Sequence, residues 1–194
     1  MGKVFLILSI SLDGYVAGPN DEIEPLHNSL FGGDTPSRHG HGLTLSAASR
    51  EVLDEALEET GACVAGRKTY DVSGGWGGEP PYPVPYFIVS QDVPPEMAGE
   101  DAPFTFVTDD VEAAIERAKA AAGDKKVSVA DADIPQQAIR AEPLDEIHIH
   151  LVPVLLGEGK RLFDHLGNQR IDLERTRVVE APEGVTHLRF RVKR

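Results

Sequence analysis

The chain has 194 residues with 19 Lys and Arg against 32 Asp and Glu, and it contains one cysteine. This length suits one ordinary domain with its own core, and a lone cysteine excludes an intrachain disulfide. The formal net charge of -13 argues against general binding to nucleic acid, which needs a basic surface. A small anionic ligand stays possible, because a few cations or a helix N-terminus can hold a phosphate locally.

The first predicted element is a strand over Val4–Ile10, an apolar segment with β-branched residues that is typical of a strand buried on both faces. The segment is shorter than a signal-peptide core and passes directly into Ser11, Leu12 and Asp13. No stretch approaches the roughly 20 apolar residues needed to cross a bilayer. We therefore expect a cytoplasmic protein without a membrane segment.

Residues 19–45 are rich in Gly, His, Pro and Asp and show little periodicity. A loop of this length is commonly a functional lid or disordered, so it could cover a cleft. The next segment, Ser46–Thr60, predicts an amphipathic helix with Val52, Leu53, Ala56 and Leu57 on its apolar side and Gly61 as its stop.

The middle of the chain alternates strands and helices. A strand over Ala62–Ala65 ends in Gly66-Arg67-Lys68-Thr69, where a helix could begin, and Gly74–Pro85 has too many Gly and Pro residues for a regular element. Asp109 is expected to cap the following helix. The remaining predicted elements here are strands over Tyr86–Ser90 and Phe104–Val107 and a helix over Val111–Ala122.

The last third predicts a strand over Lys126–Ala130, a short helix over Pro135–Ala141 and a strand over Glu146–Leu155. Strands that alternate with helices indicate a largely parallel sheet covered on both sides. The tail differs, because Arg175–Glu180 and Thr186–Val192 form an antiparallel hairpin pattern. No linker, repeat or low-complexity tract divides the chain.

Four segments resemble the dihydrofolate-reductase-like superfamily in order and spacing. They are SLDGYVAGP (Ser11–Pro19), GACVAGRKTYD (Gly61–Asp71), Phe104–Ala130 and LDEIHIHLVPVLLGEGKRLFD (Leu144–Asp164). The last is most similar to the reductase half of the bifunctional riboflavin-biosynthesis deaminase-reductase. No zinc-binding deaminase signature precedes it, so the chain resembles a stand-alone reductase domain over residues 1–194. The resemblance implies a three-layer α/β sandwich around a mixed, mostly parallel sheet.

The resemblance also implies an NADPH site at the turn from Gly66 to Thr69. This turn follows a strand and opens a helix, so its N–H groups and the helix dipole favour an anion. By resemblance, Arg67 would reach the 2'-phosphate, and Gly66 and Thr69 would meet the pyrophosphate. The alternative is a plain turn with solvated Arg67 and Lys68. Ser90 would lie near the adenosine ribose phosphate, or would simply end its strand.

Asp13 follows the first strand, at an edge where open α/β sheets gather ligands. It is a candidate for positioning substrate or for catalysis, and the alternative is an Asp-Gly turn that stabilises its own loop. By resemblance, Leu12, Asp13, Gly14 and Val16 line the cleft beside the nicotinamide and the substrate.

One segment departs from the family pattern. The family commonly has a Gly-Gly pair after the Lys126–Ala130 strand, where the backbone approaches the pyrophosphate, and this chain has Ala130-Asp131-Ala132 instead. An Asp here would place like charge beside a pyrophosphate. Asp131 and Asp133 could alternatively cap the helix at Pro135.

Several other residues have two interpretations. Lys160 and Arg161 could hold a substrate phosphate or form a solvated turn, and Trp76 could stack on a ring or pack against its own loop. The histidines suggest a metal site, but no carboxylate or thiol completes a ligand set, so we expect none. These histidines are His27, His39, His41, His148 and His150. The buried acid of dihydrofolate reductases has no match within residues 21–49, so folate is not expected.

We therefore expect hydride transfer from NADPH to a small heterocyclic or carbonyl-type substrate. The alternative is a non-catalytic ligand-binding or dimerisation module that has lost its pyrophosphate site. A homodimer is expected, since related domains pair through their sheets and the terminal strand carries Leu188, Phe190 and Val192 on one face. Arg189 and Arg191 could instead protect its edge and leave a monomer.

Overall fold

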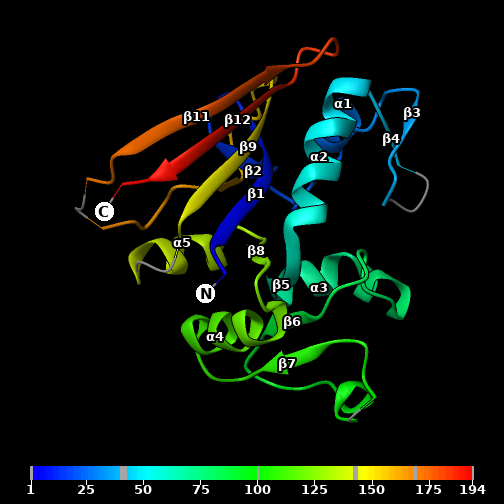
Figure 1. Ribbon diagram of the computed structural model, residues 1–194, viewed down its shortest axis with the longest axis vertical. Helices are drawn as coiled ribbons and strands as arrows, with labels where there is room; N and C mark the ends of the chain where they lie inside the picture. The colour runs from blue at the N-terminus through cyan, green and yellow to red at the C-terminus, as the bar shows by residue number, and fades with distance from the viewer. Residues whose placement is uncertain (1, 40–42, 100, 142–143, 168–169, 194) are drawn as a thin grey trace.

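The central feature of the computed structural model is an eight-stranded sheet in the order β11-β12-β9-β1-β8-β5-β6-β7 (Figure 1). The strands from β9 to β7 run parallel, and β12 and β11 continue the sheet in antiparallel pairing. The structure describes residues 2–39, 43–99, 101–141, 144–167 and 170–193. The strands are β1 (Val4–Ser11), β5 (Thr60–Gly66), β6 (Tyr86–Val89), β7 (Thr105–Val107), β8 (Lys126–Val129), β9 (Glu146–Val152), β11 (Leu173–Glu180) and β12 (Thr186–Val192). The expected α/β fold with a C-terminal antiparallel hairpin is confirmed.

Helices cover both faces of this sheet. Helices α4 (Val111–Ala122) and α5 (Asp133–Arg140) pack on the apolar side chains of β1, β5, β8 and β9 in the largest core cluster. Helices α1 (Glu24–Leu30) and α2 (Ala47–Glu59) lie together on the other side (Figure 1). Helix α3 (Arg67–Val72) follows β5, and two small two-stranded sheets pair β2 (Tyr15–Ala17) with β10 (Lys160–Arg161) and β3 (Thr35–Pro36) with β4 (Thr44–Leu45).

Several predicted boundaries are wrong by a few residues. Asp110, not Asp109, caps α4, because the residue before the helix has extended backbone angles and its carboxylate accepts from Ala113 N at 2.8 Å. Asp109 pairs with Arg117 instead. Gly61 is not a stop, since α2 runs directly into β5 at Thr60.

Two segments predicted to lack regular structure contain short helices. Residues 19–45 hold α1, which begins with Pro25 in its first turn, a position where proline is favourable. The Gly- and Pro-rich stretch contains the 3-10 turn η1 (Gly74–Gly78), built from residues with positive φ, and a second 3-10 turn, η2, spans Pro95–Met97. Helix α5 begins at Asp133, two residues before the prediction, and has no side-chain cap.

The exposed edge near the C-terminus is β11, not the terminal strand. β12 lies between β9 and β11, so its apolar face packs against the core formed with α5. The expectation that the terminal strand itself forms the edge is therefore wrong, and the edge carries Glu174, Arg175 and Arg177.

A buried histidine network lies between the sheet and α2. His150 of β9 and His187 of β12 face each other in register, with their Nδ1 atoms 2.7 Å apart. His187 Nε2 lies 2.8 Å from Ser49 Oγ, and Ser49 in turn donates to Glu183. Both residues are 3% exposed, and His150 Nε2 has no hydrogen-bond partner among the described residues. His148 lies two residues before His150 and contacts Glu146.

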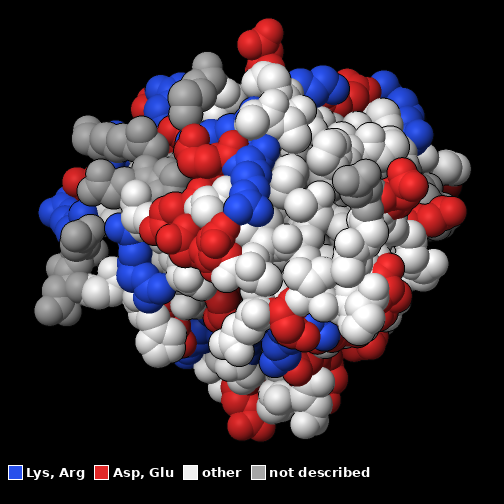
Figure 2. Space-filling view, turned by 90° about the horizontal axis from the view of Figure 1, so that it is seen from below, with Lys and Arg blue, Asp and Glu red and all other residues white. Residues whose placement is uncertain are grey.

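The remaining expectations from the sequence concern the cysteine, membrane segments, metal ligands and surface charge. Cys63 is buried as expected, and burial raises the pKa of its thiol to about 12. No helix in the part of the chain that the structure describes is long and apolar enough to span a membrane. In the same part, no three His, Cys, Asp or Glu side chains are arranged to hold a metal ion; His41 lies outside the described residues. On the face seen in Figure 2, Lys and Arg are interspersed with Asp and Glu.

Candidate functional site

A cavity of about 260 Å³ lies where β1, β5 and β8 approach their carboxyl ends. Parallel α/β sheets gather ligands at this edge, because the loops that follow neighbouring strands meet there. Here the turn after β5 meets the loop after β8, and β2, α1 and η1 complete the walls. The lining consists of Leu8, Ser9, Val16, Ala17, Asp21, Ile23, Leu26, His27, Lys68, Thr69, Val72, Ser73, Trp76, Ala130, Asp131, Ala132 and Lys160.

The turn after β5 divides its polar side chains between this cavity and a neighbouring surface. Lys68 and Thr69 line the cavity. Arg67 points instead toward the end of β6, where its Nη1 donates to Ser90 Oγ at 3.3 Å and to Asp92 Oδ1 at 3.1 Å. Its Nε donates to Asp71 Oδ1 at 2.8 Å. Arg67 and Ser90, which the family resemblance places near one ligand phosphate, therefore lie together.

The loop after β8 contributes a carboxylate to the cavity wall. Asp131 has a φ of 85°, a conformation that side chains seldom adopt and glycine adopts readily. Its side chain is 7% exposed, and its Oδ1 lies 3.1 Å from Lys160 Nζ. Lys160 also contacts Asp133 Oδ2 at 2.7 Å. The expectation that Asp131 and Asp133 cap α5 through their side chains is wrong, because the N-cap residue is Ala132 and both carboxylates pair with Lys160.

Gly66 lies directly beneath this carboxylate. A Cβ on Gly66 would lie 2.5 Å from Asp131 Oδ2, closer than real contacts allow. The glycine thus lets the Asp131 carboxylate pack directly against the backbone that opens α3. The site holds a negative charge at the place where the family resemblance implies a pyrophosphate.

Asp13 stabilises its own loop and does not line the cavity. Its carboxylate accepts from Ser11 Oγ at 2.7 Å, from Leu156 N at 3.1 Å and from Gly157 N at 2.7 Å. The Ser11 hydrogen bond, followed by those two backbone groups, lowers the pKa of Asp13 to about 2 against the opposing effect of desolvation. A carboxylate held this firmly in its charged form is a poor general acid or base near neutral pH.

The residues around Asp13 form the outer side of the same loop. Arg161 Nη1 donates to the Asp13 carbonyl at 3.2 Å, and its guanidinium lies 4.5 Å from the centre of the Tyr15 ring. Leu12 is 64% exposed, and Gly14 lies beside Arg161. Of the predicted cleft residues in this segment, Val16 lines the cavity, whereas Leu12, Asp13 and Gly14 do not.

Trp76 packs among aromatic side chains and also reaches the cavity. It belongs to an aromatic cluster, with its ring centre 5.7 Å from that of Phe104 and 6.1 Å from that of Tyr70. It also lines the cavity. The cluster holds the indole ring in place. The part of Trp76 that lines the cavity offers a flat surface to a ligand.

Sequence reasoning missed several residues of the lining, among them three with polar side chains. Asp21 pairs with Lys68 at 2.7 Å across the cavity, His27 reaches it from α1, and Ser9 lies within β1 itself. The only signal was the interpretation of residues 19–45 as a segment that could cover a cleft, and α1 does contribute Leu26 and His27. Local pattern cannot identify such residues, because the contacts join parts of the chain that are distant in sequence.

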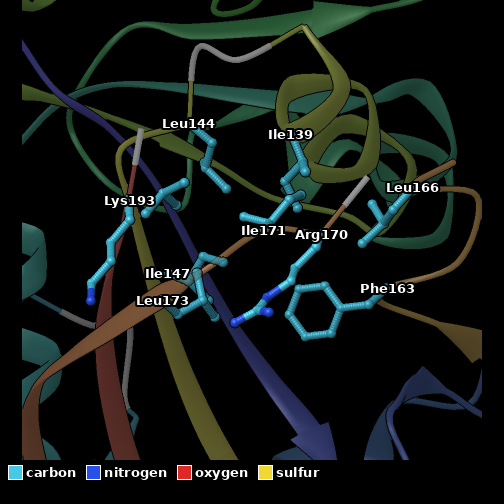
Figure 3. A pocket seen from close by; sticks show the side chains of 10 residues that line it. Ile139, Leu144, Ile147, Phe163, Leu166, Arg170, Ile171, Leu173 and Lys193 are labelled. Atoms are coloured by element: carbon cyan, nitrogen blue, oxygen red, sulfur yellow. The ribbon is translucent and has the colours of Figure 1, made fainter. Parts of the chain in front are cut away.

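A larger cavity, of about 400 Å³, lies between α5 and the strands β9, β11 and β12. In Figure 3 the side chains of Ile139, Leu144, Ile147 and Ile171 point toward a common space, and Arg170 extends beside Phe163. The described residues of its lining include no carboxylate, hydroxyl or imidazole. The smaller cavity, which combines these groups, is therefore the candidate reaction site.

Comparison with solved structures supports the α/β fold described above. The chain is similar to a protein of Shewanella sp. PV-4 described under riboflavin biosynthesis, with 21% identity, 99% of each chain covered and a TM-score of 0.76. A pyrimidine reductase-like protein of Corynebacterium diphtheriae has 14% identity and a TM-score of 0.67 over 100% of this chain and 92% of its own.

A longer relative is the diaminohydroxyphosphoribosylaminopyrimidine deaminase/5-amino-6-(5-phosphoribosylamino)uracil reductase of Thermotoga maritima. Its identity is 11% and its TM-score 0.66, with 99% of this chain but 57% of the Thermotoga chain covered. No curated protein matches the sequence. The RibD C-terminal domain matches residues 2–187. The chain therefore belongs to the RibD C-terminal domain family, as the resemblance of its four segments implied.

Proposed function

We propose that the chain is a cytoplasmic, NADPH-dependent reductase of a small heterocyclic substrate, similar to the uracil reductase activity named for the Thermotoga relative. The main support is that three predicted segments meet around one cavity in a member of this family. The turn Gly66–Thr69, the loop Ala130–Ala132 and Val16 all contribute to it. NADPH would supply the hydride, and the chain would bind, orient and shield the reactants.

The adenosine end of NADPH fits the residues present. Arg67 and Ser90 lie together and offer a guanidinium and a hydroxyl to a 2'-phosphate. The carboxylates that now pair with Arg67 belong to Asp71 and Asp92, whose side chains are 53% and 74% exposed. Exposed ion pairs contribute little stability, so a phosphate can replace them.

The diphosphate fits less well. The Asp131 carboxylate, packed over Gly66, would face it with like charge. We therefore expect NADPH to bind more weakly than it would with glycine at this position. The poor match between the Asp131 carboxylate and a diphosphate favours the second candidate function, a ligand-binding module without catalysis.

Reduction of a ring or carbonyl also requires a proton, and we propose His27 as its donor. His27 belongs to the cavity lining, and histidine exchanges protons near neutral pH. Desolvation lowers the pKa of His27, with Glu24 opposing the shift. The protonated ring is therefore a stronger acid than a free imidazole, although less of it is protonated at neutral pH.

A homodimer is also proposed. The β11 edge has no strand beside it in the part of the chain that is described, and the nearby 400 Å³ cavity is flanked by Phe163 and Leu173, each 40% exposed. A second copy could cover both features.

The decisive experiment is a thermal-shift titration with NADPH and NADH, combined with an absorbance assay for NADPH oxidation in the presence of candidate uracils. A ligand at 100 times its dissociation constant stabilises by about 2.7 kcal/mol. Stabilisation by NADPH together with substrate-dependent oxidation supports the reductase. No stabilisation by either dinucleotide would exclude it and favour the non-catalytic module.

A further inference from the structure

The larger cavity, about 400 Å³ in volume, has no part in the proposed reaction and reaches into the main core. Its inner wall is formed by Ile139 of α5, by Leu144 and by Ile147 of β9, which are 9%, 2% and 3% exposed. Phe163 and Leu173, each 40% exposed, form the outer part of the wall. Small-molecule sites commonly measure about 300–1,000 Å³, so the size of this cavity suits a small ligand.

The charged groups of this lining are cations. Among its described residues, Arg170 and Lys193 carry charge and the others are apolar. The whole chain has 32 Asp and Glu against 19 Lys and Arg, so a lining with cations and no described carboxylate departs from the average composition. In Figure 3 the Arg170 and Lys193 side chains lie on either side of Leu173. Both residues are exposed, so positive charge lies at the mouth of an apolar space.

The Asp172 carboxylate competes with a ligand for Arg170. Its Oδ1 lies 2.9 Å from Arg170 Nε and 2.8 Å from Nη2. The two side chains are 58% and 86% exposed, and ion pairs in such positions contribute little stability. Two other carboxylates beside the lining in sequence have their own partners: Asp145 accepts a backbone N–H of β1, and Glu174 pairs with Arg191. An anionic ligand can therefore take the place of Asp172 at little cost.

The lining restricts the chemistry of a ligand. Its described residues offer no hydroxyl, carboxylate or imidazole to a polar group inside the cavity. Polar groups that lose water without gaining a new partner oppose binding, so sugars and nucleotides fit poorly. A cationic head group would meet Arg170 and Lys193 with like charge. An apolar body that ends in one anionic group matches both the interior and the mouth.

We propose that this cavity is a second ligand site, separate from the reaction site, and that it binds a small amphipathic carboxylate. An apolar chain of roughly eight carbon atoms would lie against Leu144 and Ile147. Its carboxylate would accept hydrogen bonds from Arg170 or Lys193 at the mouth. The site goes beyond the proposed function and does not depend on it, because the described linings of the two cavities share no residue.

The test is isothermal titration calorimetry of the full chain with octanoate, 1-octanol and octylammonium at neutral pH and low ionic strength, where charges are least screened. We expect one octanoate to bind per chain, about fivefold more tightly than 1-octanol, with octylammonium weakest. Hexanoate should bind at least about tenfold more weakly than octanoate, since each buried CH₂ group contributes about fourfold in affinity. Binding of 1-octanol or octylammonium as tight as that of octanoate would overturn the proposal, as would the absence of octanoate binding.

Variants assign the binding to this cavity. Arg170→Gln and Lys193→Gln should each weaken octanoate by about threefold and leave 1-octanol unchanged, because they remove charge rather than apolar wall. Phe163→Ala should weaken both compounds, since it removes part of that wall. Arg191→Gln, at an exposed arginine of β12 outside the described lining, is the matched control and should bind octanoate like the wild type. Equal losses in Arg191→Gln and in the two mouth variants, or no loss in any variant, would overturn the proposal.

The homodimer proposed above involves the same side of the molecule. A second copy that pairs along the edge of β11 would leave the interior of the cavity free, whereas a side chain of that copy inside the cavity would exclude the ligand. Light scattering at saturating octanoate distinguishes these cases. An unchanged mass agrees with a free cavity, and conversion of a dimer into monomers would overturn the proposal.

The reaction site is tested separately on the same samples. Trp76, the single tryptophan, lines the smaller cavity, so a change in its fluorescence on addition of octanoate would place the ligand in the reaction site and overturn the proposal. If NADPH is not oxidised with any uracil but octanoate binds as expected, the reductase assignment fails and the second site stands. If NADPH is oxidised and octanoate does not bind, the second site fails and the reductase assignment stands.

Discussion

Mild acid is expected to destabilise the fold through the histidine network between the sheet and α2. Ser49 Oγ donates to Glu183, so the same oxygen accepts a hydrogen bond from His187 Nε2–H. The Nδ1 of a neutral His187 is then an acceptor, and the bond to His150 requires the proton on His150 Nδ1. A second proton on either ring would remove the acceptor at His187 or place an unpaired N–H in the core at His150 Nε2.

The expected magnitude follows from the depressed pKa of His150. Desolvation, then the charges of His187 and His148, lower this pKa from 6.5 to about 3. The unfolded chain therefore binds the proton first, so stability is complete above about pH 6.5 and falls as the pH decreases toward 3. At 1.36 kcal/mol per pH unit, acidification to about pH 5 costs about 2 kcal/mol from His150 alone. Desolvation also lowers the pKa of His187 and His148, which adds loss in the same direction.

The measurement is urea unfolding at about pH 7.5 and pH 5, a window that lies above the ordinary pKa range of the carboxylates. In His150→Gln the loss of unfolding free energy between these two values should shrink by about 2 kcal/mol. His165→Asn, at an exposed histidine with a φ of 56°, is the matched control and should behave like the wild type. An undiminished loss in His150→Gln would refute the reasoning.

Four further outcomes are expected. Arg67→Ala should weaken NADPH more than NADH, since its partner is a phosphate present only in NADPH; equal losses in titrations would contradict that role. Glycine at Asp131 and Ala132 should tighten dinucleotide binding by removing a charge and a Cβ, and should relieve about 1–3 kcal/mol of backbone strain at Asp131; unchanged or weaker binding would show that the loop serves another ligand. His27→Asn should lower kcat by about a hundredfold or more with little change in NADPH affinity, and an unaltered kcat would exclude the proton-donor role. Light scattering should give a mass near 42 kDa, about twice the 21.0 kDa chain, and a concentration-independent mass near the single-chain value would exclude the dimer.

The fold could be predicted from sequence where burial follows a simple pattern. The apolar run that forms β1 and the one-sided pattern of α2 have few alternative structures, because their side chains must be removed from water. Helix α1 was missed because it is only seven residues long and contains proline and histidine. The choice between Asp109 and Asp110 as the cap depends on a single backbone conformation, which two adjacent aspartates do not distinguish.

The candidate site was predictable in its segments but not in its charges. The turn at Gly66 and the loop at Asp131 were both identified, and both line or border the cavity. The pairing of Lys160 with Asp131 and Asp133 joins positions 29 and 27 residues apart. No local pattern predicts such a contact. The sequence therefore indicated a basic turn at Lys160, whereas in the structure its charge is neutralised by the two carboxylates.

The seclusion of Cys63 makes the chain convenient for site-specific labelling. Its thiol is buried and stays protonated at neutral pH, so maleimide and iodoacetamide reagents should not react with it in the folded protein. A cysteine introduced on the exposed side of α1 would then be the sole reactive thiol. An energy-transfer acceptor attached there, with Trp76 as donor, would report directly whether α1 moves toward the cavity when a ligand enters.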